Sequence, residues 1–290
     1  MNSTTVISWS ILQLRGLVAS LLFITIIAVA SAVVANGQTP SSTPDDEPDF
    51  IVPARPTVSN PAEFQKPGVL QLEFGYNANF HANRVSAEQD TPLALRFAIS
   101  RRLLVEVDTD SPFSQTVSDG ARATGLSDTQ LGIQAVLHHE SQSRPGVALA
   151  YYIKWPTASS TKGLGTGRVD HILIALVSKK INRTTIDFNG IYLLAGRAAE
   201  RGYASSGQAA LAASYKVTEK FGVQGEISGF SRNDMQPGGM LGLGVVTYQI
   251  NRRVVLDGGL RCGLTRDVPR VGVVAGLTVG VADLYKKLHK

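Results

Sequence analysis

Hydrophobic and polar residues alternate with a period of two along the stretch from Gly207 to Gly229. In the first arm, one face carries Ala209, Leu211, Ala213, Tyr215 and Val217, and the other carries Gln208, Ala210, Ala212, Ser214 and Lys216. After a polar turn at 218–220, the second arm places Phe221, Val223 and Ile227 opposite Gln224, Glu226 and Ser228. Two alternating arms of about ten residues, joined by a tight turn, predict an antiparallel hairpin long enough to cross a membrane at a tilt.

The same alternation recurs along the chain and predicts twelve strands. They are expected near residues 68–80, 92–100, 103–108, 131–138, 147–155, 168–179, 184–195, 207–217, 221–229, 239–249, 253–264 and 270–280. The segment at 168–179 is apolar on both faces, so the pattern leaves its register open. Short turns near 101, 143, 181, 219 and 252 alternate with longer loops. The prediction is an all-β fold, a single transmembrane antiparallel up-and-down β-barrel over residues 68–282, with short periplasmic turns and longer extracellular loops.

Composition fits a barrel wall, in which half of the residues face lipid and half face the lumen. Hydrophobic residues make up 43% of the chain and charged residues 18%, yet the hydrophobic residues are dispersed along the strands. Aromatic residues fall into two groups according to the end of the predicted barrel at which they lie. Phe97, Tyr215, Phe221 and Tyr248 lie near short turns, whereas Tyr76, Trp155, Tyr192 and Phe230 lie toward the long loops. Two such belts are typical of the two membrane interfaces.

The segments outside the barrel have their own composition. Residues 1–35 are predicted to be a signal peptide, with an apolar run from Leu17 to Val34 and small-residue cleavage sites at 30–32 and 33–35; an uncleaved anchor is the alternative. Residues 36–67 are polar and proline-rich and are predicted to be a disordered periplasmic leader, docked in part at the barrel mouth. Residues 283–290 form a basic C-terminal tail. Cys262 is the single cysteine, which excludes an internal disulfide.

Three segments carry a resemblance to a known family: Arg55–Glu73, Asp90–Arg96 and Asp128–Gly132. Together they resemble the outer-membrane proteins grouped under the meta-pathway of phenol degradation, which are described as transporters or channels. The resemblance implies a barrel and uptake of small compounds, aromatic ones among them, and it assigns no site residues. Such barrels commonly end on an aromatic residue that the barrel-assembly machinery reads. This chain ends in ADLYKKLHK, and Tyr285 is the nearest substitute.

Catalytic and cofactor sites are not expected. His171 sits where a barrel phospholipase would need a serine two residues on, but that position is Leu173. His138, His139 and Glu140 resemble a metal cluster in sequence, yet adjacent strand residues point to opposite faces. The glycine-rich stretch 163–167 lacks the strand-then-helix context of a phosphate loop. The sequence therefore predicts no enzyme, no cofactor and no metal.

The predicted lumen carries charges of both signs. The inward set is Glu73, Arg96, Glu106, Asp108, Lys154, Asp187, Lys216, Glu226, Asp257 and Arg261. These residues fit either a network of paired charges that stiffens the wall or a polar constriction that guides solutes.

An outer-membrane channel for small solutes is the leading hypothesis. A structural or surface-interaction barrel with a filled lumen is the alternative, and a lipid-acting enzyme is the remaining class. Expected partners are membrane lipid, a small-molecule solute and the barrel-assembly machinery. A nucleic-acid partner is not expected, because the basic residues lie in scattered turns and in the tail.

Overall fold

The computed structural model describes residues 49–288, apart from 83–84, 112, 118–119, 199–200 and 234. The signal peptide predicted at 1–35 lies outside the described residues and stays a prediction, as does the part of the leader at 36–48. No helix in the described part of the chain is long and apolar enough to cross a membrane.

The described residues form one antiparallel sheet of fifteen strands. In chain order the strands are β1 (Val69–Ala82), β2 (Val85–Asp90), β3 (Leu93–Ala98), β4 (Leu103–Thr109), β5 (Phe113–Val117), β6 (Arg122–Gly125), β7 (Thr129–His138), β8 (Gly146–Trp155), β9 (Asp170–Ile181), β10 (Thr184–Gly196), β11 (Tyr203–Lys216), β12 (Phe221–Phe230), β13 (Gly239–Asn251), β14 (Val254–Gly263) and β15 (Val271–Asp283). Two short helices, η2 (Ser160–Lys162) and α2 (Leu284–Leu288), are also described.

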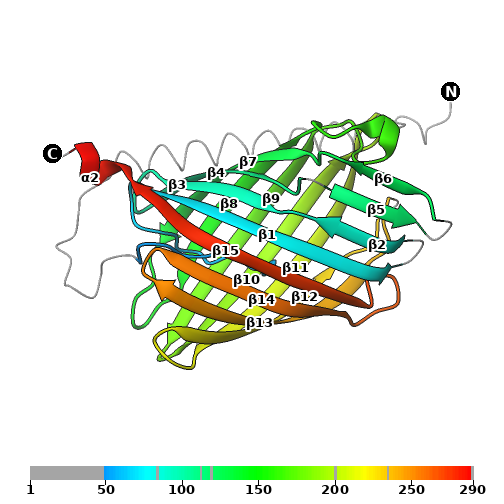
Figure 1. Cartoon of the computed structure of the whole chain (residues 1–290). Helices are drawn as coiled ribbons and strands as arrows, with labels where there is room; N and C mark the ends of the chain where they lie inside the picture. Colours follow the sequence, from blue (N-terminus) through cyan, green and yellow to red (C-terminus); the bar gives the residue numbers. More distant parts are fainter. Residues whose placement is uncertain are drawn as a thin grey trace, which may run out of the picture. The chain divides into compact units, whose positions relative to one another are not determined.

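The sheet closes on itself to form a barrel (Figure 1). Strand β1 pairs with β15 from Val69↔Asp283 to Phe80↔Val271, and most other strands pair with their neighbours in sequence. Strands β2, β5 and β6 continue β3, β4 and β7 past the long-loop rim, so the closed wall contains twelve strands. The predicted twelve-strand up-and-down barrel is therefore confirmed.

The wall exposes apolar side chains on its outer face, as the alternation predicts. On β12, Val223 and Ile227 are exposed by 37% and 55%, whereas Glu226 and Ser228 between and beside them are 5% exposed. Leu211 on β11 and Leu260 on β14 continue this outer surface. An apolar exterior on a closed barrel is the surface that a membrane requires, because lipid offers no partner for polar groups.

The structure differs from the sequence prediction at the long-loop rim. Residues 111–126 were expected to form a loop, and they contain the β5–β6 hairpin instead. Strand β5 pairs with β2, another segment expected to be a loop. Both pairings extend the hydrogen bonding of wall strands beyond the apolar band. Strands this short give too few alternating positions for a sequence pattern to detect.

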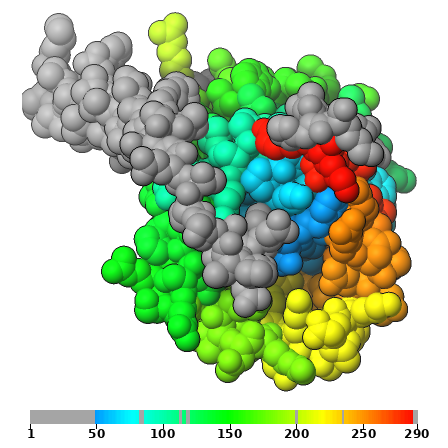
Figure 2. Space-filling model, turned by 90° about the vertical axis from the view of Figure 1, so that its left-hand side faces the viewer, coloured from blue at the N-terminus to red at the C-terminus, as the bar shows by residue number. Residues whose placement is uncertain are grey.

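A larger difference concerns residues 49–68, here called the lumenal segment. The sequence predicted a disordered leader for 36–67, but its described part is an irregular chain inside the barrel. Figure 2 looks onto the short-turn end and shows these blue residues surrounded by the wall strands. At the edge of this end, the amide of Lys66 donates to the carbonyl of Asp49 (2.9 Å), so the segment enters and leaves at nearly the same place.

Tyr285 on α2 connects the closing strands to the first short turn. Its hydroxyl donates to the carbonyl of Ile99 (2.7 Å), and its ring lies edge-on to Phe97 with centroids 6.1 Å apart. Gly68 leaves the space that the Tyr285 ring occupies, with a φ of +83°. Tyr285 therefore covers the β1–β15 junction, while recognition of this residue by the assembly machinery stays a prediction.

Candidate functional site

The lumenal segment is bound by wall carboxylates through its backbone amides. Glu73 on β1 accepts hydrogen bonds from the amides of Ala54 (3.0 Å) and Arg55 (3.1 Å). Across the lumen, Glu226 on β12 accepts from the amides of Val58 (3.0 Å) and Ser59 (2.7 Å), and from the Ser59 hydroxyl (3.0 Å). Both carboxylates are buried. Charge-assisted bonds of this kind are stronger than neutral ones and fix the path of a chain without regular structure.

Arg55 forms an ion pair with Asp257 on β14. Its Nε and Nη2 donate to the two carboxylate oxygens of Asp257 at 3.0 and 3.1 Å, and Nη2 also donates to the carbonyl of Ala275 at 2.9 Å. Gly75 and Gly276 face each other across the β1–β15 pair, and a Cβ on either would collide with the guanidinium. The two glycines thus form the space in which the Arg55 side chain lies.

The second half of the segment crosses to the opposite wall. The Asn60 amide donates to Oδ1 of Asn189 (2.8 Å), whose Nδ2 donates back to the Asn60 carbonyl (2.9 Å). The Ala62 amide donates to Oγ of Ser178 (2.7 Å), and Gln134 donates to the carbonyls of Pro61 and Ala62. Wall side chains thereby satisfy backbone groups that would otherwise be buried without partners.

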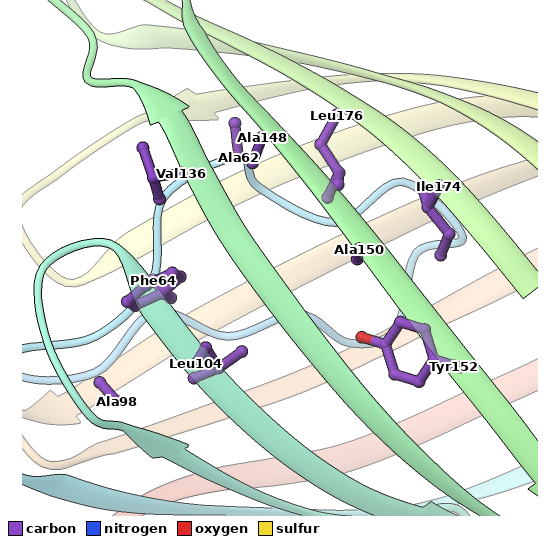
Figure 3. Packing of buried hydrophobic residues seen from close by; sticks show 10 residues of the cluster. All are labelled: Ala62, Phe64, Ala98, Leu104, Val136, Ala148, Ala150, Tyr152, Ile174 and Leu176. Carbon is purple, nitrogen blue, oxygen red and sulfur yellow. The ribbon is translucent and has the colours of Figure 1, made fainter. Parts of the chain in front are cut away.

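Apolar contacts hold the same region. Ala62 and Phe64 pack into a buried cluster with wall residues of five strands (Figure 3). The wall members are Ala98, Leu104, Val136, Ala148, Ala150, Tyr152, Ile174 and Leu176. This cluster explains why the strand predicted at 168–179 is apolar on both faces: one face of β9 meets lipid and the other meets the lumenal segment.

Where the segment leaves the lumen, Glu63 contacts the β7–β8 turn. Its Oε1 lies 3.2 Å from Nδ1 of His139 and accepts from the Glu140 amide (2.7 Å). Burial acts to raise the pKa of Glu63, but the hydrogen bonds from His139 and Glu140 outweigh it and lower the pKa below its ordinary value. At the other side, Arg253 lies over the Phe50 ring at 4.3 Å from its centroid.

The structure places the ten predicted pore-lining residues in several different settings. Glu73, Glu226 and Asp257 bind the lumenal segment directly. Arg96 pairs with Glu73 (3.2 Å) and Glu106 (3.0 Å) and donates to the Val52 carbonyl, while Asp187 accepts from Ser178. Asp108 and Arg261 are half-buried farther toward the long loops, where Arg261 donates to Asn79 (3.2 Å). Lys216 is exposed beside the β11–β12 turn, so it lies outside this lumenal set.

Lys154, the remaining member, lies at the long-loop end. Its Nζ pairs with Asp128 (2.9 Å) and with Asp170, both buried. Asp128 also accepts from the amide of Ala158 in the loop after β8 (2.9 Å), and Asp170 accepts from the amide of Gly196 at the end of β10 (2.8 Å). This charge cluster therefore holds the loop after β8 and the end of β10 at the rim.

Sequence reasoning missed the uncharged wall residues that bind the segment: Gln71, Gln134, Ser178 and Asn189. A polar inward side chain is equally compatible with water in an open lumen. The signal that was available is the pair of inward glycines on adjacent strands, because glycine in a strand often marks close approach of another chain.

His171 is the histidine at which the sequence raised a catalytic alternative. His171 lies on β9, and its ring nitrogens contact the hydroxyls of Tyr151 (2.7 Å) and Tyr203 (3.2 Å). Within the described residues, no group of three or more His, Cys, Asp or Glu side chains is placed to hold a metal ion.

Comparisons with known proteins agree with this architecture. The family described as "Putative MetA-pathway of phenol degradation" matches residues 54–279. The COG4313 outer membrane channel from Pseudomonas putida F1 shares the fold at a TM-score of 0.60 and 13% identity, over 79% of this chain and 99% of that one. The NanC porin also shares the fold, with a TM-score of 0.50 and 8% sequence identity, over 73% of this chain and 98% of the porin chain. No curated protein sequence matches the chain.

The closed barrel, its apolar exterior and these structural relatives define the class: the protein has the fold of an outer-membrane β-barrel. Within that class, the chain belongs to the phenol-degradation meta-pathway family, whose match covers most of its length and confirms the resemblance found in the sequence.

Proposed function

We propose that the protein is an outer-membrane channel for small compounds, aromatic or hydrophobic ones among them, and that the lumenal segment narrows its passage. The observation that carries the proposal is the binding of residues 49–68 inside the barrel by side chains from opposite walls. A segment in this position lies in the path of any solute, so its packing sets the width of the route. The name of the Pseudomonas putida protein, an outer membrane channel, supports the same role.

Apolar side chains on the inner wall favour a solute that is itself apolar. Ile172 and Ile191 border the buried cluster around Phe64, and Leu243, Val245 and Val274 form a second cluster on β13 and β15. Ligand sites for aromatic compounds combine such apolar surfaces with a few polar groups that orient the solute. Glu106 and Tyr152, joined by a hydrogen bond (3.3 Å), are polar groups of that kind.

A structural barrel with a filled lumen is the second candidate, and the same lumenal segment favours it. Planar-bilayer recordings and vesicle uptake separate the two. The purified protein should give discrete conductance steps, and vesicles that contain it should take up an aromatic carboxylate faster than a disaccharide. A protein that conducts no ions and admits neither solute, even after the lumenal segment is loosened, would contradict the channel and leave the structural role.

The orientation of the barrel follows from loop length, because outer-membrane barrels place short turns in the periplasm. In a Cys262→Ala background, Thr161→Cys in the long β8–β9 loop should react with an impermeant thiol reagent on intact cells. Thr218→Cys in the β11–β12 turn should react only after the cells are opened. The reverse labelling pattern would invert the proposed topology.

A further inference from the structure

Exposed basic side chains gather at the short-turn end of the barrel. Six of them, here called the basic collar, come from four of the five short turns and the strand ends beside them. They are Arg102, Arg144, Lys180, Arg183, Lys216 and Lys220. Glu219 is the one exposed carboxylate among the described residues of those turns, because Glu140 is half-buried. The collar is therefore a strongly positive surface around the short-turn mouth.

The side chains of the collar do not take part in the fold, although their backbone groups do. None of the six side chains forms an ion pair or a hydrogen bond within the described part of the chain. Their neighbours differ in this respect, because Lys179 pairs with Glu140 (3.1 Å) and Arg253 lies over the Phe50 ring. Six long cations without internal partners at one end of a barrel are available to an external anionic ligand.

The position of the basic collar along the barrel axis indicates which anionic ligand it can bind. Lys180 directly precedes Ile181 and Lys216 directly follows Tyr215, outer-face residues that are exposed by 53% and 46%, so both lysines lie at the height along the barrel at which the outer apolar surface ends. Tyr215, Phe221 and Tyr248 form an aromatic belt at this end, each exposed on the outer face. Aromatic belts mark the headgroup level of a bilayer, and Lys and Arg side chains at such positions reach toward the interface.

We propose that the basic collar binds the phosphate groups of anionic phospholipids, so that the barrel selects these lipids in the leaflet at its short-turn end. Each Lys or Arg near an anionic membrane surface adds attraction, and the effect falls off with salt. A phosphodiester at the headgroup level meets several collar side chains at once, since successive turns are neighbours around the rim. The inference concerns the membrane surface and does not depend on what the lumen transports.

Spin-labelled lipids test the proposal on the full-length barrel in phosphatidylcholine vesicles. The wild-type protein should prefer spin-labelled phosphatidylglycerol over phosphatidylcholine by about threefold or more at low salt. A variant with Arg102, Lys180, Lys216 and Lys220 changed to glutamine should lose most of this preference. The matched control exchanges Arg and Lys at the same four positions, keeps the charge and should keep the preference. Heat-modifiable migration on gels verifies that all three barrels are folded.

Two results would overturn the inference. One is a wild-type protein without lipid preference, or a glutamine variant that keeps it, in which case the collar serves another partner such as an acidic protein. The other concerns free phosphate, which shares the chemistry of the headgroup. If inorganic phosphate abolishes the preference at an ionic strength where chloride does not, the collar is a site for soluble phosphate and not for lipid.

Discussion

Replacing Gly276 with valine should release the lumenal segment and raise the single-channel conductance several-fold. The new side chain would occupy the space of the Arg55 guanidinium, which lies against Gly276 and Gly75. Arg55 would then lose its two bonds to Asp257, and breaking a buried pair in this way costs about 3–5 kcal/mol. Valine favours strands, so the wall itself should keep its pairing. Planar-bilayer recording measures the outcome.

Gly258→Val is the matched control, on the strand next to Gly276. A Cβ there would meet only the Val274 carbonyl, at an ordinary 3.9 Å. This variant should conduct like the wild type. Equal conductance in the wild type and in Gly276→Val would mean either that the segment does not limit the passage or that Arg55 does not hold it.

Ile227→Arg should destabilise the folded barrel by about 2–4 kcal/mol, the cost of a cation on the lipid face near the bilayer midplane. Ile227 is 55% exposed, and both of its paired neighbours, Leu211 and Gly242, lie within their strands and away from the turns. A guanidinium at this position has only hydrocarbon around it. Urea unfolding in lipid vesicles, followed by gel mobility, measures the difference.

An outer-face residue at a different depth in the membrane provides the control for this prediction. Ile250 is also an outer-face residue, 45% exposed, but it lies next to the β13–β14 turn. Ile250→Arg should therefore cost only about 0–1 kcal/mol, because the side chain reaches the interface. Equal costs at the two positions would show that the outer face of β12 is not in contact with hydrocarbon.

The wall was predictable because each strand has lipid on one side. Lipid requires every second residue of a wall strand to be apolar. In β11 and β12 the residues between them are mostly polar or small, so the alternation is visible in the sequence. The rule weakens at β9, where Ile174 and Leu176 point inward against Ala62 and Phe64. An apolar inner face removes the contrast on which the sequence pattern depends.

The lumenal segment was not predictable in the same way. Prolines and polar residues exclude helix and strand, but they describe a disordered chain and an irregular ordered chain equally well. The groups that order this segment are distant in sequence: Val58 and its acceptor Glu226 are 168 residues apart. No local pattern records such a contact. The inward charges were identified from their alternation, but their partners in the segment were not.

A reversible tether between the lumenal segment and the wall tests the central claim most directly. The amide of Ala62 donates to Oγ of Ser178 at 2.7 Å, so the two residues are in contact, and Ala62→Cys with Ser178→Cys is the pair chosen for a disulfide. The two changes are combined with Gly276→Val and Cys262→Ala, and one channel is recorded before and after a reductant is added. The conductance should be low while the disulfide is intact and should rise several-fold when it is reduced. The same conductance in both states, with the disulfide verified, would contradict a channel whose width is set by this segment.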